Sequence, residues 1–238
     1  SIKTLVAFFI SLQLFANKST KIEDLSPIQF SNVEYINSST ARIPFKIVDQ
    51  LIIVEATILN QKGNFIIDTG SESLILNSVH FKSTLKQRKP NQQKSGIYNE
   101  IEGINVKHLK ALNIENISLN KLKADVIDLS HFEKIKKIEL LGIIGYSVLK
   151  DFEIFIDMHL NQITFTKTDK HGNRLSDKVY AETIHDSIDF KLKRHTIILN
   201  AYVNDKKVKF GLDTAAEYNQ LNKDVDSEIL DYFYPRNE

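Results

Sequence analysis

Two Asp-Thr pairs lie 145 residues apart in this chain of 238 residues, at Asp68-Thr69 and Asp213-Thr214. Each pair follows a short apolar run, so each carboxylate is expected at the end of a buried strand, where the chain turns. Two carboxylates that face each other at a few ångströms share one proton, because both cannot easily ionise. The ionised member can then take a proton from water while the protonated member polarises a carbonyl group. The pattern therefore predicts hydrolytic chemistry by paired aspartates.

The residues after Asp68 suit such a turn. Gly70 tolerates backbone angles that other residues avoid and leaves room for a ligand. Thr69 can brace the turn, and the Ser71 hydroxyl lies near enough to donate to the carboxylate. The alternative is a strand-end aspartate that only caps a turn. That alternative has more support at Asp213, where Ala215 stands in place of the glycine.

The two pairs belong to a longer internal match. Placing each residue from 45 to 77 over the residue 145 positions later, with no gap, gives 12 identities in 33 positions. Unrelated sequences would give about two at common residue frequencies. The match includes Glu72 with Glu217, and it predicts a duplication that forms two lobes related by an approximate two-fold axis.

Short runs rich in Ile and Val, bounded by Gly, Asn, Asp or Lys, are typical of many short strands. Only residues 133–139 and 146–151 are expected to form helices. The fold class is therefore expected to be mainly β, with the sheet closed or sandwiched. The expected strands are 45–48, 51–59, 64–67, 74–76, 104–112, 117–119, 124–129, 152–156 and 162–165.

The segment 68–71 (Asp-Thr-Gly-Ser), followed by apolar residues 74–76, resembles the active-site signature of retropepsin-like aspartic proteases. Residues 140–145 (Leu-Leu-Gly-Ile-Ile-Gly) are similar to the glycine segment that packs under the catalytic loop in that family. The resemblance covers about residues 41–166 and restarts near 188. It implies a retropepsin/pepsin-like acid protease β-barrel lobe with a second, incomplete homologous lobe.

The same resemblance implies an aspartic endopeptidase that binds peptide or protein substrates in an extended form. It implies no metal and no organic cofactor, and it places a mobile flap within residues 92–103. The catalytic residues would be Asp68 and Asp213. The residues that support them would be Thr69, Gly70, Ser71, Thr214 and Ala215.

The composition excludes several other classes of protein. The chain has 31 Lys and Arg against 30 Asp and Glu, a net charge of +1, which does not favour nucleic-acid binding. It has no cysteine, which excludes disulfides, cysteine-ligated metal sites and a cysteine nucleophile. Its seven histidines are spread along the chain, without a short-range ligand pair.

The N-terminal residues are expected to direct export. Residues 1–16 combine Lys3 with an apolar run of about a dozen residues, as in a secretory signal peptide, and the run is too short for a stable membrane span. We therefore expect a periplasmic, cell-surface or secreted protein. The expected organisation is a signal peptide (1–16), a linker or pro-region (17–40), lobe 1 (41–168), a linker (169–186) and a partial lobe 2 (187–238).

The second lobe departs from the family pattern, because only 23 residues follow Ala215. Either the chain is a fragment, or the second lobe is degenerate, or activity needs another subunit. A homodimer that pairs Asp68 with its symmetry mate is one alternative. Another is an exported peptide-binding module without catalysis.

Two other groups of charges are expected to be structural. Lys134, Lys136 and Lys137 predict a solvated basic face. Asp157 precedes a probable turn, and its carboxylate is expected to bond to the backbone of that turn.

Overall fold

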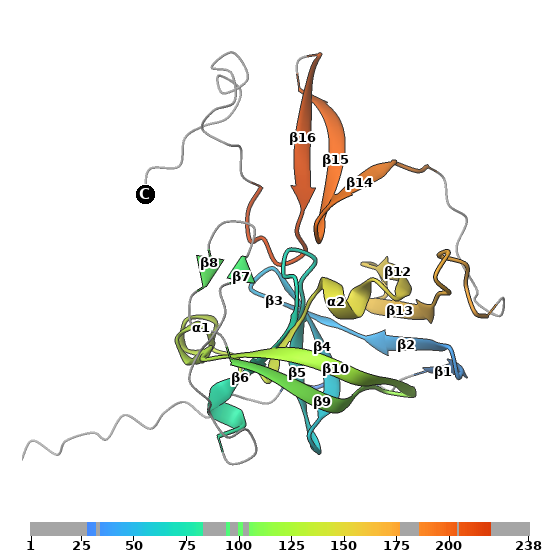
Figure 1. The fold of residues 1–238 in the computed structure, drawn as a ribbon. Coiled ribbons are helices and arrows are strands. Elements are labelled where there is room, and N and C mark those ends of the chain that lie inside the picture. Colours follow the sequence, from blue (N-terminus) through green and yellow to red (C-terminus); the bar gives the residue numbers. More distant parts are fainter. Residues whose placement is uncertain are drawn as a thin grey trace, which may run out of the picture.

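The computed structural model describes residues 28–31, 34–82, 94–95, 100–101, 105–176, 186–203 and 205–219 (Figure 1). Strands dominate these residues, so the prediction of a mainly β fold is confirmed. None of their helices is both long and apolar enough to cross a bilayer. The expected signal peptide at 1–16 lies outside the described residues.

The centre of the fold is a closed barrel of six strands. Neighbouring strands pair in the order β4-β5-β11-β6-β10-β9, and β9 pairs back with β4 to close the ring. The strand β3 (Lys46–Val48) extends the sheet beside β4. The barrel strands are β4 (Leu51–Ile58), β5 (Gln61–Ile67), β6 (Leu74–Asn77), β9 (Asn105–Ile114), β10 (Ile117–Ile127) and β11 (Gly142–Ile144).

The packing of strand β4 on both of its faces explains why its sequence is a continuous apolar run. Successive side chains of a strand point to opposite faces. Ile52, Val54 and Ala56 therefore join the main core, while Leu51 and Ile53 join a second apolar cluster on the other face. Both faces of β4 are covered, so both need apolar residues.

The second apolar cluster consists of Leu51, Ile53, Ile66, Ile138 and Leu140. The helix α1 (Ser130–Lys136) flanks it, and Phe132 of this helix packs against it. The helix begins three residues before the predicted range and ends at Lys137, whose backbone is left-handed (φ 51°). A 3-10 helix, η1 (Ser78–His80), follows β6, and a short helix, α2 (Tyr146–Leu149), follows β11.

A four-stranded sheet lies beside the barrel. Its order is β1-β2-β13-β12, and Ile43, Ile163, Phe165 and Phe152 join its strands to the main core. Part of the polar stretch 17–40 thus forms strands. The members are β1 (Glu34–Asn37), β2 (Thr40–Pro44), β12 (Phe152–Asp157) and β13 (Gln162–Lys167).

The C-terminal part of the described chain forms a separate sheet above the barrel (Figure 1). It consists of β14 (Phe190–Lys193), β15 (Thr196–Val203) and β16 (Lys206–Leu212). Its register equals that of β3, β4 and β5 shifted by 145 residues: Lys46 pairs with Ile53, and Lys191 with Ile198. Likewise Ala56 pairs with Gly63, and Ala201 with Val208.

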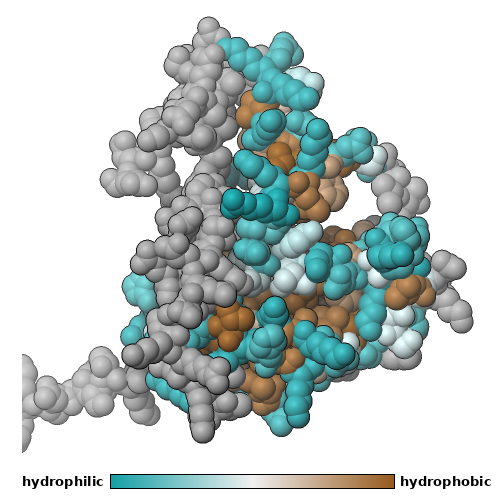
Figure 2. Space-filling model, in the orientation of Figure 1, coloured by the Kyte–Doolittle hydropathy of each residue, from teal (hydrophilic) through white to brown (hydrophobic). Residues whose placement is uncertain are grey.

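The two matching sheets differ in burial. Phe45 is 1% exposed in the barrel core, whereas Phe190, at the matching position, is 55% exposed. Leu192 and Leu212 are exposed too, and Figure 2 shows apolar side chains at the surface over this sheet. This sheet therefore leaves apolar side chains exposed that the matching sheet buries in the barrel.

Gly142 gives a test of the barrel packing. A Cβ at this position would overlap the carbonyl oxygen of Ile75 and lie 2.9 Å from Phe65 Cε1. Since overpacking of this kind costs about 1–3 kcal/mol, we expect Gly142→Ala to lower the free energy of unfolding by at least that amount in urea titrations. The control is Gly211→Ala, whose Cβ would lie 3.5 Å from Thr196 Cγ2, an ordinary contact. Equal midpoints for the two variants would contradict the packing described for β11.

Candidate active site

Asp68 follows β5 directly, and its carboxylate accepts three hydrogen bonds. Oδ1 accepts from the backbone N–H groups of Gly70 (2.7 Å) and Ser71 (3.1 Å). The Ser71 hydroxyl donates to Oδ2 at 2.6 Å. Hydrogen bonds to an ionised acceptor are the short and strong ones, so this turn both orients the carboxylate and stabilises its charge.

Residues 142–147 support the Asp68 turn from below. The backbone N–H of Asp68 donates to the Ile144 carbonyl (3.1 Å), and that of Tyr146 donates to the Ser71 carbonyl (2.8 Å). The Ser147 N–H donates to the Glu72 carbonyl (3.0 Å). Gly145 permits this approach, because a Cβ there would overlap the Ser73 carbonyl and lie 2.7 Å from the Ser71 carbonyl oxygen. The glycine segment thus packs under the turn, as the resemblance implies.

Asp213 follows β16 as Asp68 follows β5. Its Oδ1 accepts a hydrogen bond from the Ala215 N–H (2.9 Å). Burial raises the pKa of Asp213, although the N–H of Ala215 opposes the rise. The negative charge of Asp68, and a hydrogen bond between the two side chains, raise the pKa further. The two carboxyl groups are therefore direct neighbours, and Asp213 is the one that retains a proton more readily than a free aspartate does.

Two threonines hold the two turns together by reciprocal hydrogen bonds. The Thr69 N–H donates to Thr214 Oγ1 (3.1 Å), and the Thr214 N–H donates to Thr69 Oγ1 (3.0 Å). Each hydroxyl also donates across the junction, from Thr69 to the Leu212 carbonyl (3.0 Å) and from Thr214 to the Ile67 carbonyl (2.8 Å). Donors and acceptors exchange roles at positions 145 residues apart, so the junction has approximate two-fold symmetry.

The two motifs differ at their third residue for a steric reason. A Cβ on Gly70 would lie 2.6 Å from Asp213 Cγ, so a glycine is required there if the carboxyl groups are to meet. The Ala215 methyl group instead packs against the second apolar cluster. The structure thus brings together all seven predicted site residues. Ala215, the alanine of the second motif, packs its methyl group on the second apolar cluster.

Two other predictions concern residues near or beyond this site. Of the expected flap, 92–103, the structure describes β7 (Lys94–Ser95) and β8 (Glu100–Ile101), which pair antiparallel, and the rest lies outside the described residues. Asp157 accepts hydrogen bonds from the N–H groups of His159 (2.9 Å) and Leu160 (2.8 Å), as predicted for a turn carboxylate.

The prediction of a solvated basic face is wrong for Lys136. Its side chain is only 5% exposed, and its ammonium contacts the carboxylates of Asp49 and Glu217. The reason is that the end of α1 faces the turn that carries Asp213, which a one-dimensional charge pattern does not show. The one sequence feature that pointed to Glu217 is its identity with Glu72 in the internal match, which indicates that both turns keep a glutamate at this position.

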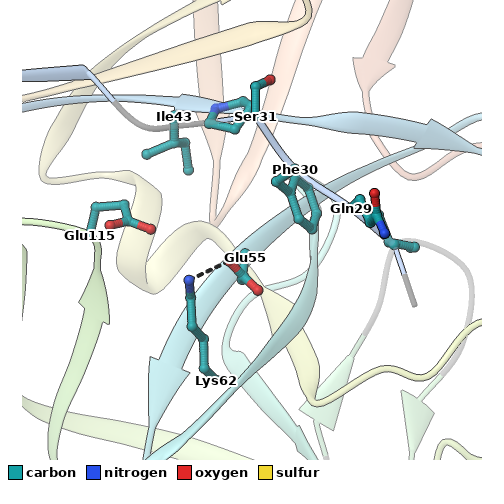
Figure 3. A pocket seen from close by; sticks show the side chains of 9 residues that line it. Gln29, Phe30, Ser31, Ile43, Glu55, Lys62 and Glu115 are labelled. Atoms are coloured by element: carbon teal, nitrogen blue, oxygen red, sulfur yellow. Dashed lines mark ion pairs between the residues drawn. The ribbon is translucent and has the colours of Figure 1, made fainter.

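A cavity of about 550 Å³ lies elsewhere, between residues 28–31 and the β4–β5 hairpin (Figure 3). Its walls include Glu55, Lys62 and Glu115, with Lys62 and Glu55 in an ion pair at 2.6 Å. No residue of either aspartate turn lines it. Within the described ranges, no three His, Cys, Asp or Glu side chains are grouped as metal ligands would be.

Comparison with known proteins gives one match in sequence and several in structure. Residues 54–148 match the sequence model of a family described as aspartyl proteases. No curated protein matches the chain. A retropepsin-like aspartic protease from Rickettsia conorii is 17% identical, with a TM-score of 0.37, over 58% of this chain and 95% of that one. The EIAV protease complexed with the inhibitor HBY-793 is 18% identical, with a TM-score of 0.31, over 42% and 85% of the two chains.

The matched residues include most of the barrel, the turn that carries Asp68 and the glycine segment under it. These are the elements that position the first carboxylate. Residues 54–148, which hold the turn that carries Asp68 and the glycine segment under it, are therefore similar in sequence to the aspartyl protease family.

Proposed function

We propose that this protein is an aspartic endopeptidase in which Asp68 and Asp213 of one chain form the catalytic pair. The observation that carries the proposal is the reciprocal threonine junction, because it brings the two aspartate turns of the same chain face to face. The raised pKa of Asp213, caused by burial and by the adjacent Asp68 carboxylate, supports it.

The hydrogen bonds assign different roles to the two carboxyl groups. Asp68, with three donors, is the ionised member and accepts a proton from the attacking water. Asp213, protonated, donates to the carbonyl oxygen of the scissile peptide bond as the water oxygen bonds to its carbon. Asp68 then returns its proton to the amide nitrogen while the C–N bond breaks, and Asp213 recovers a proton as the carbonyl re-forms. Protons balance over the cycle, so neither a metal nor a cofactor is needed.

The substrate would be an extended peptide or protein segment that adds main-chain hydrogen bonds as an extra strand does. The antiparallel pair β7–β8 belongs to the region proposed as a flap over it.

We further propose that lobe 1 spans 41–168 and that 187–238 is a partial copy of it, which the common register of the two sheets supports. Export remains a proposal that rests on residues 1–16 alone.

The homodimer alternative would pair Asp68 with the same residue of a second chain. In the structure, however, Thr69 exchanges hydrogen bonds with Thr214 of its own chain. The alternative of a peptide-binding module without catalysis would require that the two carboxyl groups do not interact. The effect of Asp68 on the pKa of Asp213 favours the enzyme instead.

The first prediction for this function concerns the two aspartates. We expect Asp68→Asn and Asp213→Asn each to lower peptide cleavage by about 10²-fold or more, because each removes a group that transfers a proton. Cleavage of a random peptide library, followed by mass spectrometry at acidic and neutral pH, measures it. Asp157→Asn is the matched control, since its carboxylate only bonds to a turn. Undiminished turnover by Asp68→Asn would rule out the enzyme, and survival of activity in Asp213→Asn alone would support the homodimer.

The second prediction uses the difference between Ser71 and Ala216, which occupy matching positions. Because the pKa of Asp213 is raised, activity is retained as the pH rises above the range where a free aspartate loses its proton (about 3.9), and it falls when Asp213 deprotonates. Ala216→Ser would give Asp213 a hydroxyl donor like that of Ser71. We expect this to stabilise the ionised form and lower the pKa of Asp213, which moves the alkaline limb of kcat to lower pH.

The matched control for that shift is Ala216→Gly, which changes the side chain but adds no donor. Its alkaline limb should stay where it is in the unaltered protein. If both substitutions move the limb by the same amount, or neither does, the titrating group is not Asp213.

A further inference from the structure

The turn that carries Asp213 is attached to the barrel mainly through polar contacts. It extends from a sheet whose apolar residues Phe190, Leu192 and Leu212 are exposed, so that sheet does not fix its position by packing on the barrel. The Thr69–Thr214 junction fixes it at one point. The hydrogen bonds of this junction involve Leu212 and Thr214 but do not reach Glu217, so a contact at Glu217 would fix the other end of the turn as well.

Lys136 supplies a contact of this kind. Its ammonium lies between Asp49, in the turn after β3, and Glu217, four residues after Asp213. The distance from Lys136 Nζ to Glu217 Oε1 is 2.6 Å. Burial lowers the pKa of Lys136, but its hydrogen bonds to Asp49 and Glu217 and their negative charges outweigh burial and raise it overall. The lysine therefore stays charged, and a buried charge strongly requires its partners.

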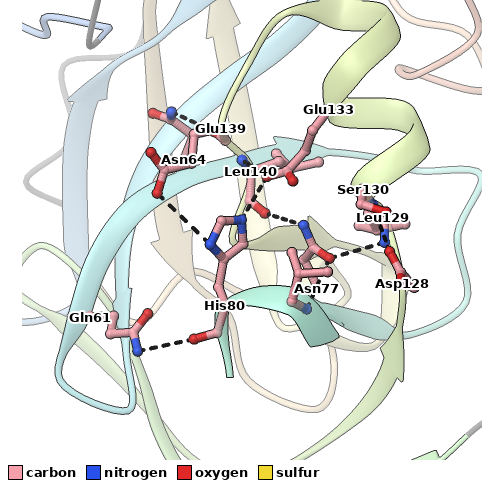
Figure 4. A network of polar contacts seen from close by, with 11 residues as sticks. Gln61, Asn64, Asn77, His80, Asp128, Leu129, Ser130, Glu133, Glu139 and Leu140 are labelled. Carbon is pink, nitrogen blue, oxygen red and sulfur yellow. Dashed lines mark hydrogen bonds and ion pairs between the residues drawn. The ribbon is translucent and has the colours of Figure 1, made fainter. Parts of the chain in front are cut away.

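The helix α1, to which Lys136 belongs, is held by a network of polar contacts at its start and middle (Figure 4). Glu133, in the same helix, accepts hydrogen bonds from the Leu140 N–H (2.7 Å) and contacts His80 Nε2 (2.7 Å). Asn77 donates to the Leu140 carbonyl (3.0 Å) and accepts from the Leu129 N–H (3.0 Å). These contacts tie the start and the middle of α1 to Asn77 at the end of β6, to His80 of η1 and to the chain entering β11.

We propose that Lys136 is a positioning residue for Asp213: by holding Glu217, it sets the orientation of the turn that presents the second carboxyl group to the first. The Ala215 N–H, which orients Asp213 Oδ1, lies between the two fixed points at Thr214 and Glu217. The Ala215 methyl group packs on the apolar cluster beside α1, which brings the same segment of chain against the barrel. This inference rests on the proposed function, since it assigns Lys136 a role in the geometry of the aspartate pair.

The two partners of Lys136 provide a matched comparison. Glu217→Gln and Asp49→Asn each remove one carboxylate from the same ammonium, but only Glu217 belongs to the turn of Asp213. We expect Glu217→Gln and Lys136→Met to lower kcat about tenfold or more with a smaller change in KM, because small displacements of reacting groups are costly. Asp49→Asn should lower kcat less, and Lys136→Arg, which keeps the positive charge, should retain most of the activity.

A second measurement does not depend on activity. The carboxyl carbon of Asp213 can be titrated by NMR in the full chain. In Glu217→Gln and Lys136→Met, we expect the pKa of Asp213 to fall toward that of a free aspartate, because its carboxyl group moves away from Asp68. In Asp49→Asn and Lys136→Arg, it should remain raised. If the protein is not a protease, this shift is still seen, so failure of the proposed function and failure of this inference can be told apart.

Two outcomes would overturn the inference. One is an unchanged pKa of Asp213 in Glu217→Gln, a substitution of a partly exposed residue that the fold should tolerate. The other is an equal effect of Glu217→Gln and Asp49→Asn on both kcat and the pKa, which would make the ion pairs a feature of barrel stability alone. Circular dichroism melting of each variant checks that the barrel is folded, and Glu217→Gln keeps the test open if Lys136→Met does not fold.

Discussion

The reciprocal hydrogen bonds between Thr69 and Thr214 are the constraint on which the rest of the site depends. Each threonine accepts a backbone N–H of the other and donates to the carbonyl that precedes the opposite aspartate. Each side-chain hydroxyl thus both donates and accepts across the junction, so each turn helps to position the other. The close approach at Gly70 follows from this junction. Burial of Asp213 there, and then the adjacent Asp68 carboxylate, raise the pKa of Asp213.

The junction is nearly symmetric, but the chemistry around it is not. Three donors surround the Asp68 carboxylate, and one of them is the hydroxyl of Ser71. At the matching position after Asp213 stands Ala216, which can provide no hydroxyl. Two adjacent carboxyl groups cannot both ionise easily. In the function proposed above, the unequal donors would place the shared proton on Asp213, and this small difference in sequence between two similar turns would separate the acid from the base.

The sequence predicted the site better than it predicted the elements around it. The ungapped match of 33 positions, at an offset of 145 residues, aligned both aspartate turns through their shared Asp-Thr pair. The barrel strands were found where apolar residues recur, but β10 was expected as two strands, since Asn120, Lys121 and Lys123 interrupt its apolar pattern. Strand β1 lies in the largely polar stretch 17–40, which has few periodic cues, and β2 begins at the last residue of that stretch. A local charge pattern places Lys136 in solvent, because its partners Asp49 and Glu217 lie 87 and 81 positions away in the sequence.

The difference in burial between the two matching sheets determines how the site is held. In the barrel, the face that contains Phe45 is covered by the strands that close the ring, and burial of that area stabilises the fold at about 25 cal/mol per Å². The matching face of β14–β16 remains exposed at Phe190 and Leu192 and gains no such contribution. Hydrogen bonds add only about 1 kcal/mol each to stability, but they are directional. The threonine junction therefore specifies the geometry of Asp213 more effectively than it stabilises it. Separating a buried charge from its partner costs free energy, so a buried ion pair adds a strong positional constraint. The ion pair of Lys136 with Glu217 places such a constraint on the turn of Asp213.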